Sequence, residues 1–144
     1  MRSDYLNENS GSSFAYKKKA EYISAARTLD EDDGGKVFML DSADGAYSIT
    51  LPTAATGQDG TSYKFVVWEE TPTAIITLAA GSANVSMVMK DAGGNASNST
   101  AGTQVSNILV GVSSQRGDYI NMMFWQGEWV ADCMSSIDAA VTTS

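Results

Sequence analysis

The side chains that could perform chemistry in this chain are few, and their types exclude most catalytic and metal centres. The sequence contains no histidine, which removes the commonest general base and the commonest metal ligand. Neither a serine–histidine triad nor a histidine-based zinc site can therefore form. The one cysteine, Cys133, lies close to Trp129, Val130 and Met134 and has no second cysteine for a disulfide, so we expect it to be a small buried hydrophobic residue.

Carboxylates are the remaining candidates for chemistry. Asp30–Asp33 is the densest acidic cluster and leads into two glycines, so a calcium loop is one interpretation of it. An EF-hand loop starting at its first residue would need a carboxylate at position 5 and a glutamate at position 12, where this chain has Gly34 and Asp41. A solvated turn is the favoured interpretation, and a divalent ion at a subunit junction is the alternative. The spacing of Glu69–Glu70 and Glu128 does not indicate a glycosidase pair, so we expect no enzymatic activity, no cofactor and no metal.

Length and charge indicate one acidic domain with a basic N-terminal part. The chain has 144 residues, of which 43% are hydrophobic, and a net charge of −8, which is enough apolar material for a core. Residues 1–28 hold five basic and three acidic groups, whereas the rest holds four basic and fourteen acidic groups. An acidic body repels phosphates and anionic membranes, so we expect neither nucleic acid nor membrane as a partner. The chain also lacks a run of about 18 apolar residues and the apolar run of a signal peptide.

From residue 29 to residue 133 the chain alternates between short strand-forming runs and turn residues. Eight strands are predicted, at Lys36–Asp41, Ala46–Leu51, Tyr63–Glu69, Ala74–Leu78, Val85–Lys90, Ile108–Val112, Tyr119–Trp125 and Glu128–Cys133. The last two form the clearest hairpin. This pattern predicts an all-β body, either an antiparallel β-sandwich or a jelly-roll-like barrel. We expect residues 91–104 to form a long loop and residues 134–144 to be a frayed C-terminal tail.

Residues 1–28 show no sustained period and predict an extended N-terminal arm. A short helix over residues 17–27 is an alternative for its second half. The arm is either a solvated tail or a docking segment whose aromatic residues anchor it while its lysines meet an acidic surface. The candidate partner-binding residues are Tyr5, Phe14, Tyr16, Lys17, Lys18, Lys19, Tyr22 and Arg27.

The predicted strand Tyr119–Trp125 is apolar on both faces, which is typical of a strand buried in a core or between subunits. Because one small sandwich does not need such a strand, we expect a homo-oligomer. The candidate subunit-interface residues are Tyr119, Met123, Trp125 and Trp129. An alternative is a sugar-stacking platform made of Trp68, Trp125, Trp129 and Tyr119.

Several strand-and-turn phrases between Ala26 and Val130 resemble those of bacteriophage virion proteins, in particular head-decoration (cement) proteins and fibre or spike β-modules. The phrases are Arg27–Asp30, Asp33–Phe38, Ser48–Pro52, Gly60–Val67, Gly117–Ile120 and Gly127–Val130. The resemblance implies a place in the virion and, commonly, trimers around a three-fold axis.

On this resemblance we expect a structural capsid decoration protein. Its N-terminal arm would bind the major capsid protein on the outer capsid surface, and the bound protein would stabilise the head. The alternative is a receptor- or glycan-binding module of a phage tail fibre. The arm favours decoration, because a fibre tip normally follows a repetitive shaft, and this sequence contains none.

Overall fold

The chain folds almost entirely into strands, which confirms the all-β prediction. The computed structural model describes residues 18–70, 72–92, 96–98 and 105–144. In this part of the chain the only helices are two single 3₁₀ turns, η1 (Glu31–Asp33) and η2 (Gly81–Ala83). None of the helices in the described ranges is long and apolar enough to cross a membrane.

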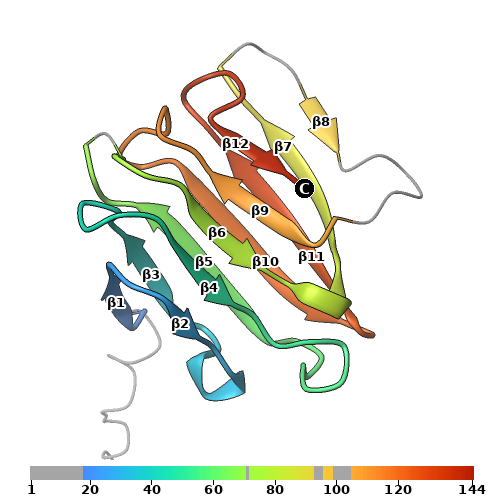
Figure 1. The fold of residues 1–144 in the computed structure, drawn as a ribbon. Helices are drawn as coiled ribbons and strands as arrows, with labels where there is room; N and C mark the ends of the chain where they lie inside the picture. The colour runs from blue at the N-terminus through green and yellow to red at the C-terminus, as the bar shows by residue number, and fades with distance from the viewer. Residues whose placement is uncertain (1–17, 71, 93–95, 99–104) are drawn as a thin grey trace, which may run out of the picture.

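The strands form two sheets (Figure 1). The seven-stranded sheet has the order β1 (Ala20–Ile23), β3 (Val37–Leu40), β5 (Ser62–Val67), β10 (Tyr119–Trp125), β11 (Glu128–Met134), β7 (Val85–Lys90), β8 (Ala96–Asn98). The five-stranded sheet has the order β12 (Val141–Thr143), β9 (Asn107–Val110), β6 (Ile76–Ala79), β4 (Tyr47–Thr50), β2 (Arg27–Thr28).

Both sheets are mixed, so the prediction of antiparallel pairing is wrong. From β1 to β7 the chain alternates between the sheets after every strand. Neighbouring strands of one sheet are therefore reached by a crossover and run in the same direction: β1, β3 and β5 are parallel, and so are β2, β4 and β6. Antiparallel pairing joins β5 to β10, β10 to β11, and β9 to β6 and β12.

The predicted hairpin is present as β10 and β11. Its two-residue turn is Gln126–Gly127, and both residues have positive φ, 49° and 89°. Such a pair of angles is typical of the type I′ turn that matches the twist of a hairpin. The residues that point inward from β10 and β11 therefore alternate in a fixed register with those that point outward.

The inner faces of the two sheets contribute to one hydrophobic core. Trp129 is fully buried there; its ring stacks on Tyr63 at 5.3 Å, and its indole Nε1–H donates to the carbonyl oxygen of Pro52 at 3.0 Å. Cys133 is buried as predicted, and burial raises the pKa of its thiol to about 12. The core explains why the fold needs no disulfide.

Both ends of the predicted body are corrected by the structure. Residues 20–23 and 27–28 belong to the sheets as β1 and β2, and Ile23 is in the core, so neither an arm reaching to residue 28 nor the alternative helix over 17–27 is right. Residues 134–144 are not a frayed tail either. Val141 is buried, and the carbonyl oxygen of Ser144 accepts hydrogen bonds from the backbone of Ser106 and Asn107 at 2.9 and 3.0 Å.

Candidate functional site

The outward-facing side of the seven-stranded sheet is rich in apolar side chains. Its outward positions follow from the alternation of burial along each strand and from the register between strands. We call this surface the apolar face. Its apolar members are Tyr22, Val37, Met39, Val66, Val88, Tyr119, Met123, Trp125, Val130 and Met134.

The five-stranded sheet presents a different outer surface, which we call the threonine face. Its members are Thr28, Ser48, Thr50, Thr77, Ala79, Asn107, Leu109 and Thr142. Of these described residues only Leu109 is large and apolar, and it is partly buried. On the apolar face, by contrast, Val88, Trp125 and Val130 are 58%, 52% and 51% exposed. Contiguous exposed apolar surface on one side of a small domain indicates a binding surface.

The register arranges the apolar face into rows that cross the strands. One row is Tyr22, Met39, Val66, Tyr119, Met134 and Lys90. The next is Ala20, Val37, Lys64, Asn121, Asp132 and Val88, and the third is Ser62, Met123, Val130 and Ser86. The second of these three rows, which we call the central row, places the cation Lys64 and the anion Asp132 on either side of the neutral amide of Asn121.

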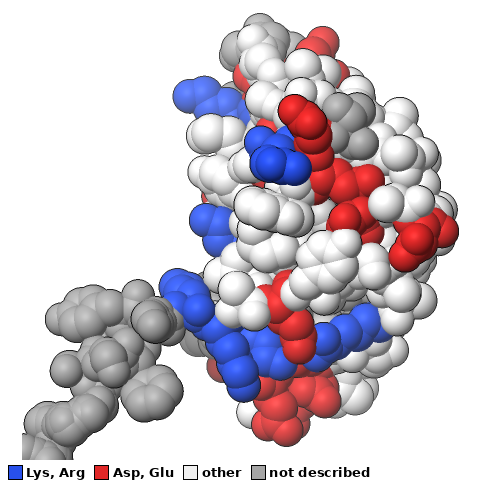
Figure 2. All heavy atoms as spheres, turned by 90° about the vertical axis from the view of Figure 1, so that its left-hand side faces the viewer, with Lys and Arg blue, Asp and Glu red and all other residues white. Residues whose placement is uncertain are grey.

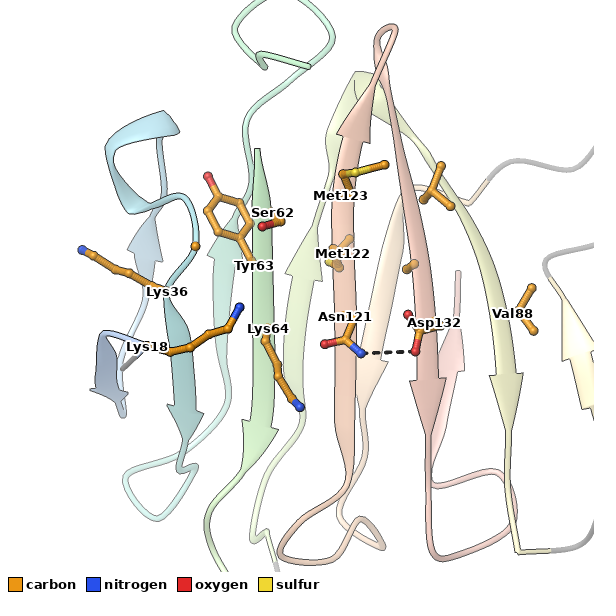
Figure 3. A pocket seen from close by; sticks show the side chains of 13 residues that line it. Lys18, Lys36, Ser62, Tyr63, Lys64, Val88, Asn121, Met122, Met123 and Asp132 are labelled. Atoms are coloured by element: carbon orange, nitrogen blue, oxygen red, sulfur yellow. Dashed lines mark hydrogen bonds between the residues drawn. The ribbon is translucent and has the colours of Figure 1, made fainter. Parts of the chain in front are cut away.

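A hollow of about 490 Å³ lies over the centre of the apolar face (Figure 3). Lys64, Asn121 and Asp132 line it from three adjacent strands, and the Asn121 Nδ2–H donates to Asp132 Oδ2 at 3.2 Å. The ammonium of Lys64 lies 4.6 Å from the ring centroid of Tyr119, within the range of a cation–π interaction. The hollow therefore combines an apolar floor with the acidic Asp132 and the basic Lys64, Lys18 and Lys36, which also line it.

Three of the four candidate interface residues lie together on this surface. Tyr119, Met123 and Trp125 all point outward from β10. Trp129 does not, and its assignment to a subunit interface is wrong, because it has no exposed surface from which to contact another chain. The alternation of side chains along β11 could have shown this from the sequence. Glu128, Val130 and Asp132 lie on one face of the strand, so Trp129 must point to the opposite, inner face.

The described part of the N-terminal segment starts beside the hollow. Lys18 lines it, and Lys19 is exposed next to it. Tyr22 is exposed on β1, and its hydroxyl donates to Asp41, which raises the pKa of Tyr22 and lowers the pKa of Asp41. The other arm candidates Tyr5, Phe14, Tyr16 and Lys17 lie outside the described residues.

Arg27, the last arm candidate, belongs to a charge cluster at the β1–β2 edge. Its guanidinium contacts Glu21 Oε1 at 2.5 Å and Asp33 Oδ1 at 2.9 Å, and the Lys36 ammonium contacts Asp33 Oδ1 at 2.5 Å. Figure 2 shows this edge, where basic side chains form a band directly above acidic ones. Arg27 is thus already paired within the chain, which sequence reasoning did not anticipate.

The acidic cluster Asp30–Asp33 is organised around these cations. Asp30 caps η1, and Asp33 completes a capping box with it. Burial alone would raise the pKa of Asp33, but hydrogen bonds from Lys36 and the Asp30 backbone, and the nearby charge of Arg27, lower it below its usual value. Within the described ranges no group of three acidic or cysteine side chains is placed to hold a metal ion. Asp33 is therefore a buried ion-pair partner rather than part of a solvated turn.

The register also separates the groups considered for sugar chemistry. Glu69 follows β5 near the Tyr119 end of β10, whereas Glu128 pairs with Trp125 at its other end. Six residue steps of strand span about 20 Å, beyond the roughly 5–9.5 Å of a glycosidase pair. The Glu69 carboxylate instead accepts hydrogen bonds from the Ser42 backbone and hydroxyl at 2.5 and 2.7 Å.

The alternative sugar-stacking platform is not assembled either, because its tryptophans are buried or lie far apart. Trp68 lies at the Glu69 end with the Arg116 guanidinium 4.8 Å from its ring centroid, Trp129 is buried, and Trp125 remains alone at the far end of the hairpin.

We compared the chain with models of known protein families and with curated protein sequences. No family model matches it, and no curated protein is detectably similar to it.

Proposed function

We propose that this protein is a non-enzymatic structural subunit of a virus particle that decorates and stabilises the outer surface of a bacteriophage head. Its body would be a two-layer β-sandwich, and its N-terminal segment would bind the major capsid protein. The observation that carries the proposal is the place where that segment joins the body. Lys18 and Lys19 precede the edge strand β1, and Lys18 lines the hollow on the apolar face. The resemblance of six strand-and-turn phrases to those of virion proteins supports the virion location.

The attachment would combine aromatic anchors with basic steering. Phe14, Tyr16 and Tyr22 would enter pockets of the capsid surface, and Lys17–Lys19 would face carboxylates, which mainly improves orientation and association rate. Ordering a segment costs on the order of 1–2 kcal/mol per residue, so the buried aromatics must supply the surplus. In a homo-oligomer several weakly binding segments act together through effective concentration.

Deleting residues 1–17 tests the proposal. A larger deletion that reaches residue 26 is unsuitable, because it would remove β1 and uncover the core next to Phe38 and Leu40. The shortened protein should keep its far-ultraviolet circular dichroism but fail to bind particles from which this protein is missing. Full occupancy of those particles by the shortened protein, seen by electron cryomicroscopy, would show that the body carries the attachment surface.

A second candidate is a receptor- or glycan-binding module of a tail fibre. The observation that favours it is the exposed Trp125, on the same face as a hollow whose polar groups include Asn121, Asp132 and Lys64. An aromatic ring beside amide and charged groups suits the stacking and hydrogen bonding of a sugar. Binding to a glycan array that is lost in Trp125→Ala, with no binding to particles, would favour this function over decoration.

A further inference from the structure

We propose that the apolar face is the contact surface between two copies of this chain, related by a two-fold axis that runs roughly along β10. The inference concerns assembly and goes beyond the proposed function, since it holds whatever the dimer then binds. It rests on the distribution of apolar and charged side chains over the face.

The apolar face differs from the threonine face in the free-energy cost of exposing its side chains to water. Val88, Met123, Trp125, Val130 and Met134 are each more than two-fifths exposed on three neighbouring strands. Covering such a surface is favourable in proportion to the apolar area removed from water. The threonine face carries hydroxyl groups that water solvates well, so the two sheets differ in their need for a partner.

The charges of the central row identify the partner as a second copy. Lys64 lies on β5, Asn121 on β10 and Asp132 on β11, so the cation and the anion stand one strand to either side of Asn121. A two-fold axis lying between two facing sheets and parallel to β10 exchanges the two sides. Lys64 of each copy then faces Asp132 of the second copy, which is the self-complementary pattern of an isologous interface.

The neighbouring rows fit the same operation. In the first row Val66 faces Met134, and Tyr119 meets its own equivalent near the axis. In the third row Ser62 faces Val130, and the two Met123 side chains meet over the hollows, where flexible thioether chains fill irregular space well. In these three rows of β5, β10 and β11 no two like charges meet: Lys64 faces Asp132, Val66 faces Met134, and the polar side chains of Ser62 and Asn121 face Val130 and a second Asn121.

The other way of stacking two such faces is unfavourable. A two-fold axis perpendicular to the strands keeps every residue on its own strand, so Lys64 would face Lys64 and Asp132 would face Asp132. Like charges placed together in an interface oppose association. The threefold arrangement expected from the resemblance to virion proteins does not make this pattern self-complementary either, because it joins two different surfaces.

The size of the face indicates a reversible dimer. Five strands about 4.8 Å apart and rows about 6.8 Å apart give a flat footprint of about 500 Å². Because the side chains stand out from the sheet, the accessible area that they bury on contact is larger than this flat footprint. The buried area per partner then approaches the small end of the range around roughly 800 Å² that stable specific complexes bury. We therefore expect dissociation on dilution rather than a permanent dimer.

Exchanging the charges of Lys64 and Asp132 tests the proposed two-fold geometry. Sedimentation velocity of the full chain over a range of concentrations should show monomer and dimer. Lys64→Glu alone and Asp132→Lys alone should each weaken the dimer at least tenfold, since each places two like-charged pairs in the interface. The double variant Lys64→Glu, Asp132→Lys should dimerise again, and an equimolar mixture of the two single variants should form heterodimers. As a matched control, Asp32→Lys reverses an exposed charge in η1, which belongs to no strand of the face, and should leave the association unchanged.

A second pair of variants tests the apolar part. Met123→Glu should abolish the dimer, whereas Leu109→Glu, the corresponding change on the threonine face, should not. Deleting residues 1–17 should leave the dimer intact, which separates this inference from the proposed role of the N-terminal segment. The inference is overturned if the full chain is monomeric or trimeric at all concentrations, if the double charge exchange fails to recover association, or if Met123→Glu and Leu109→Glu behave alike.

Discussion

The β10–β11 hairpin and the β1–β2 edge are held by different forces. The hairpin buries Trp129 between the rings of Tyr63 and Phe124, so apolar contact fixes it. The edge is fixed by the ion pairs of Arg27 and Lys36 with acidic residues. Apolar packing responds to changes of volume, whereas partly exposed ion pairs respond to pH and salt. The two regions should therefore fail under different conditions.

Shortening the buried tryptophan of the hairpin should have the largest effect. Trp129→Ala leaves a cavity and an unpaired carbonyl at Pro52, so we expect a loss of about 3–5 kcal/mol in the free energy of unfolding. Trp125→Ala, on the outward side of the same hairpin, should change it by about 0.5 kcal/mol or less in the monomer. Urea unfolding at a concentration where the protein is monomeric compares them. Equal losses would mean that Trp129 is not the core residue.

Adding one methyl group beside the hairpin should come next. A Cβ at Gly57 would lie 2.4 Å from the ring of the buried Phe124, so Gly57→Ala should cost about 1–3 kcal/mol through overpacking. The same substitution in a Phe124→Leu background should cost less, because the ring atoms that clash are gone. A double-mutant cycle from urea unfolding measures this coupling, and additive losses would contradict the predicted clash.

Removing the shared anion should weaken the edge. Asp33→Asn keeps the side-chain shape but leaves the Arg27 and Lys36 charges without their buried partner, so we expect a loss of about 1–3 kcal/mol. Asp32→Asn, one residue away and exposed, should be nearly neutral. Repeating both at about 0.5 M NaCl should shrink the Asp33 effect in part, because salt screens the Arg27 guanidinium, which is 32% exposed, even though Asp33 is buried. A loss that does not depend on salt would mean that packing, not charge, holds the edge.

Acid should weaken the edge before the hairpin, with the smallest effect of the four. The pKa of Asp33 and that of Asp41 are lowered in the folded protein. A lowered pKa contributes stability above the unfolded value of about 3.9, and this contribution is lost as pH falls through the folded pKa. The urea midpoint should therefore drop more between pH 7 and pH 3 in the native sequence than in Asp33→Asn. Equal drops would show that Asp33 titrates normally.

The sequence predicted the hairpin well because local pattern determines it. Alternation from Tyr119 to Met134 and the Gln126–Gly127 turn are enough to place β10 and β11. The same alternation could have separated Trp129 from Trp125, since Asn121 and Asp132 mark the outward positions of the two strands. What the sequence could not show is the parallel pairing, because strand direction depends on how the chain crosses between sheets.

The edge was predicted poorly because charges conceal it. Ala20–Ile23 is short, follows Lys18 and Lys19, and includes Glu21, so it looks like an irregular arm. The charge of Glu21 is neutralised by Arg27 and Lys36, which come from other elements, and Lys36 also pairs with Asp33. Sequence composition counts such charges but does not show which of them pair, and it therefore assigned Arg27 to an external partner.

The alternation of β1 to β6 between the sheets has a consequence for how this architecture varies. Each pair β1–β2, β3–β4 and β5–β6 adds one strand to each sheet, always at the same edge and in the same direction (Figure 1). Gain or loss of one such pair by insertion or deletion would widen or narrow the molecule while the hairpin kept both its neighbours. The width of the domain is thus a variable that evolution or design can change in steps of two strands.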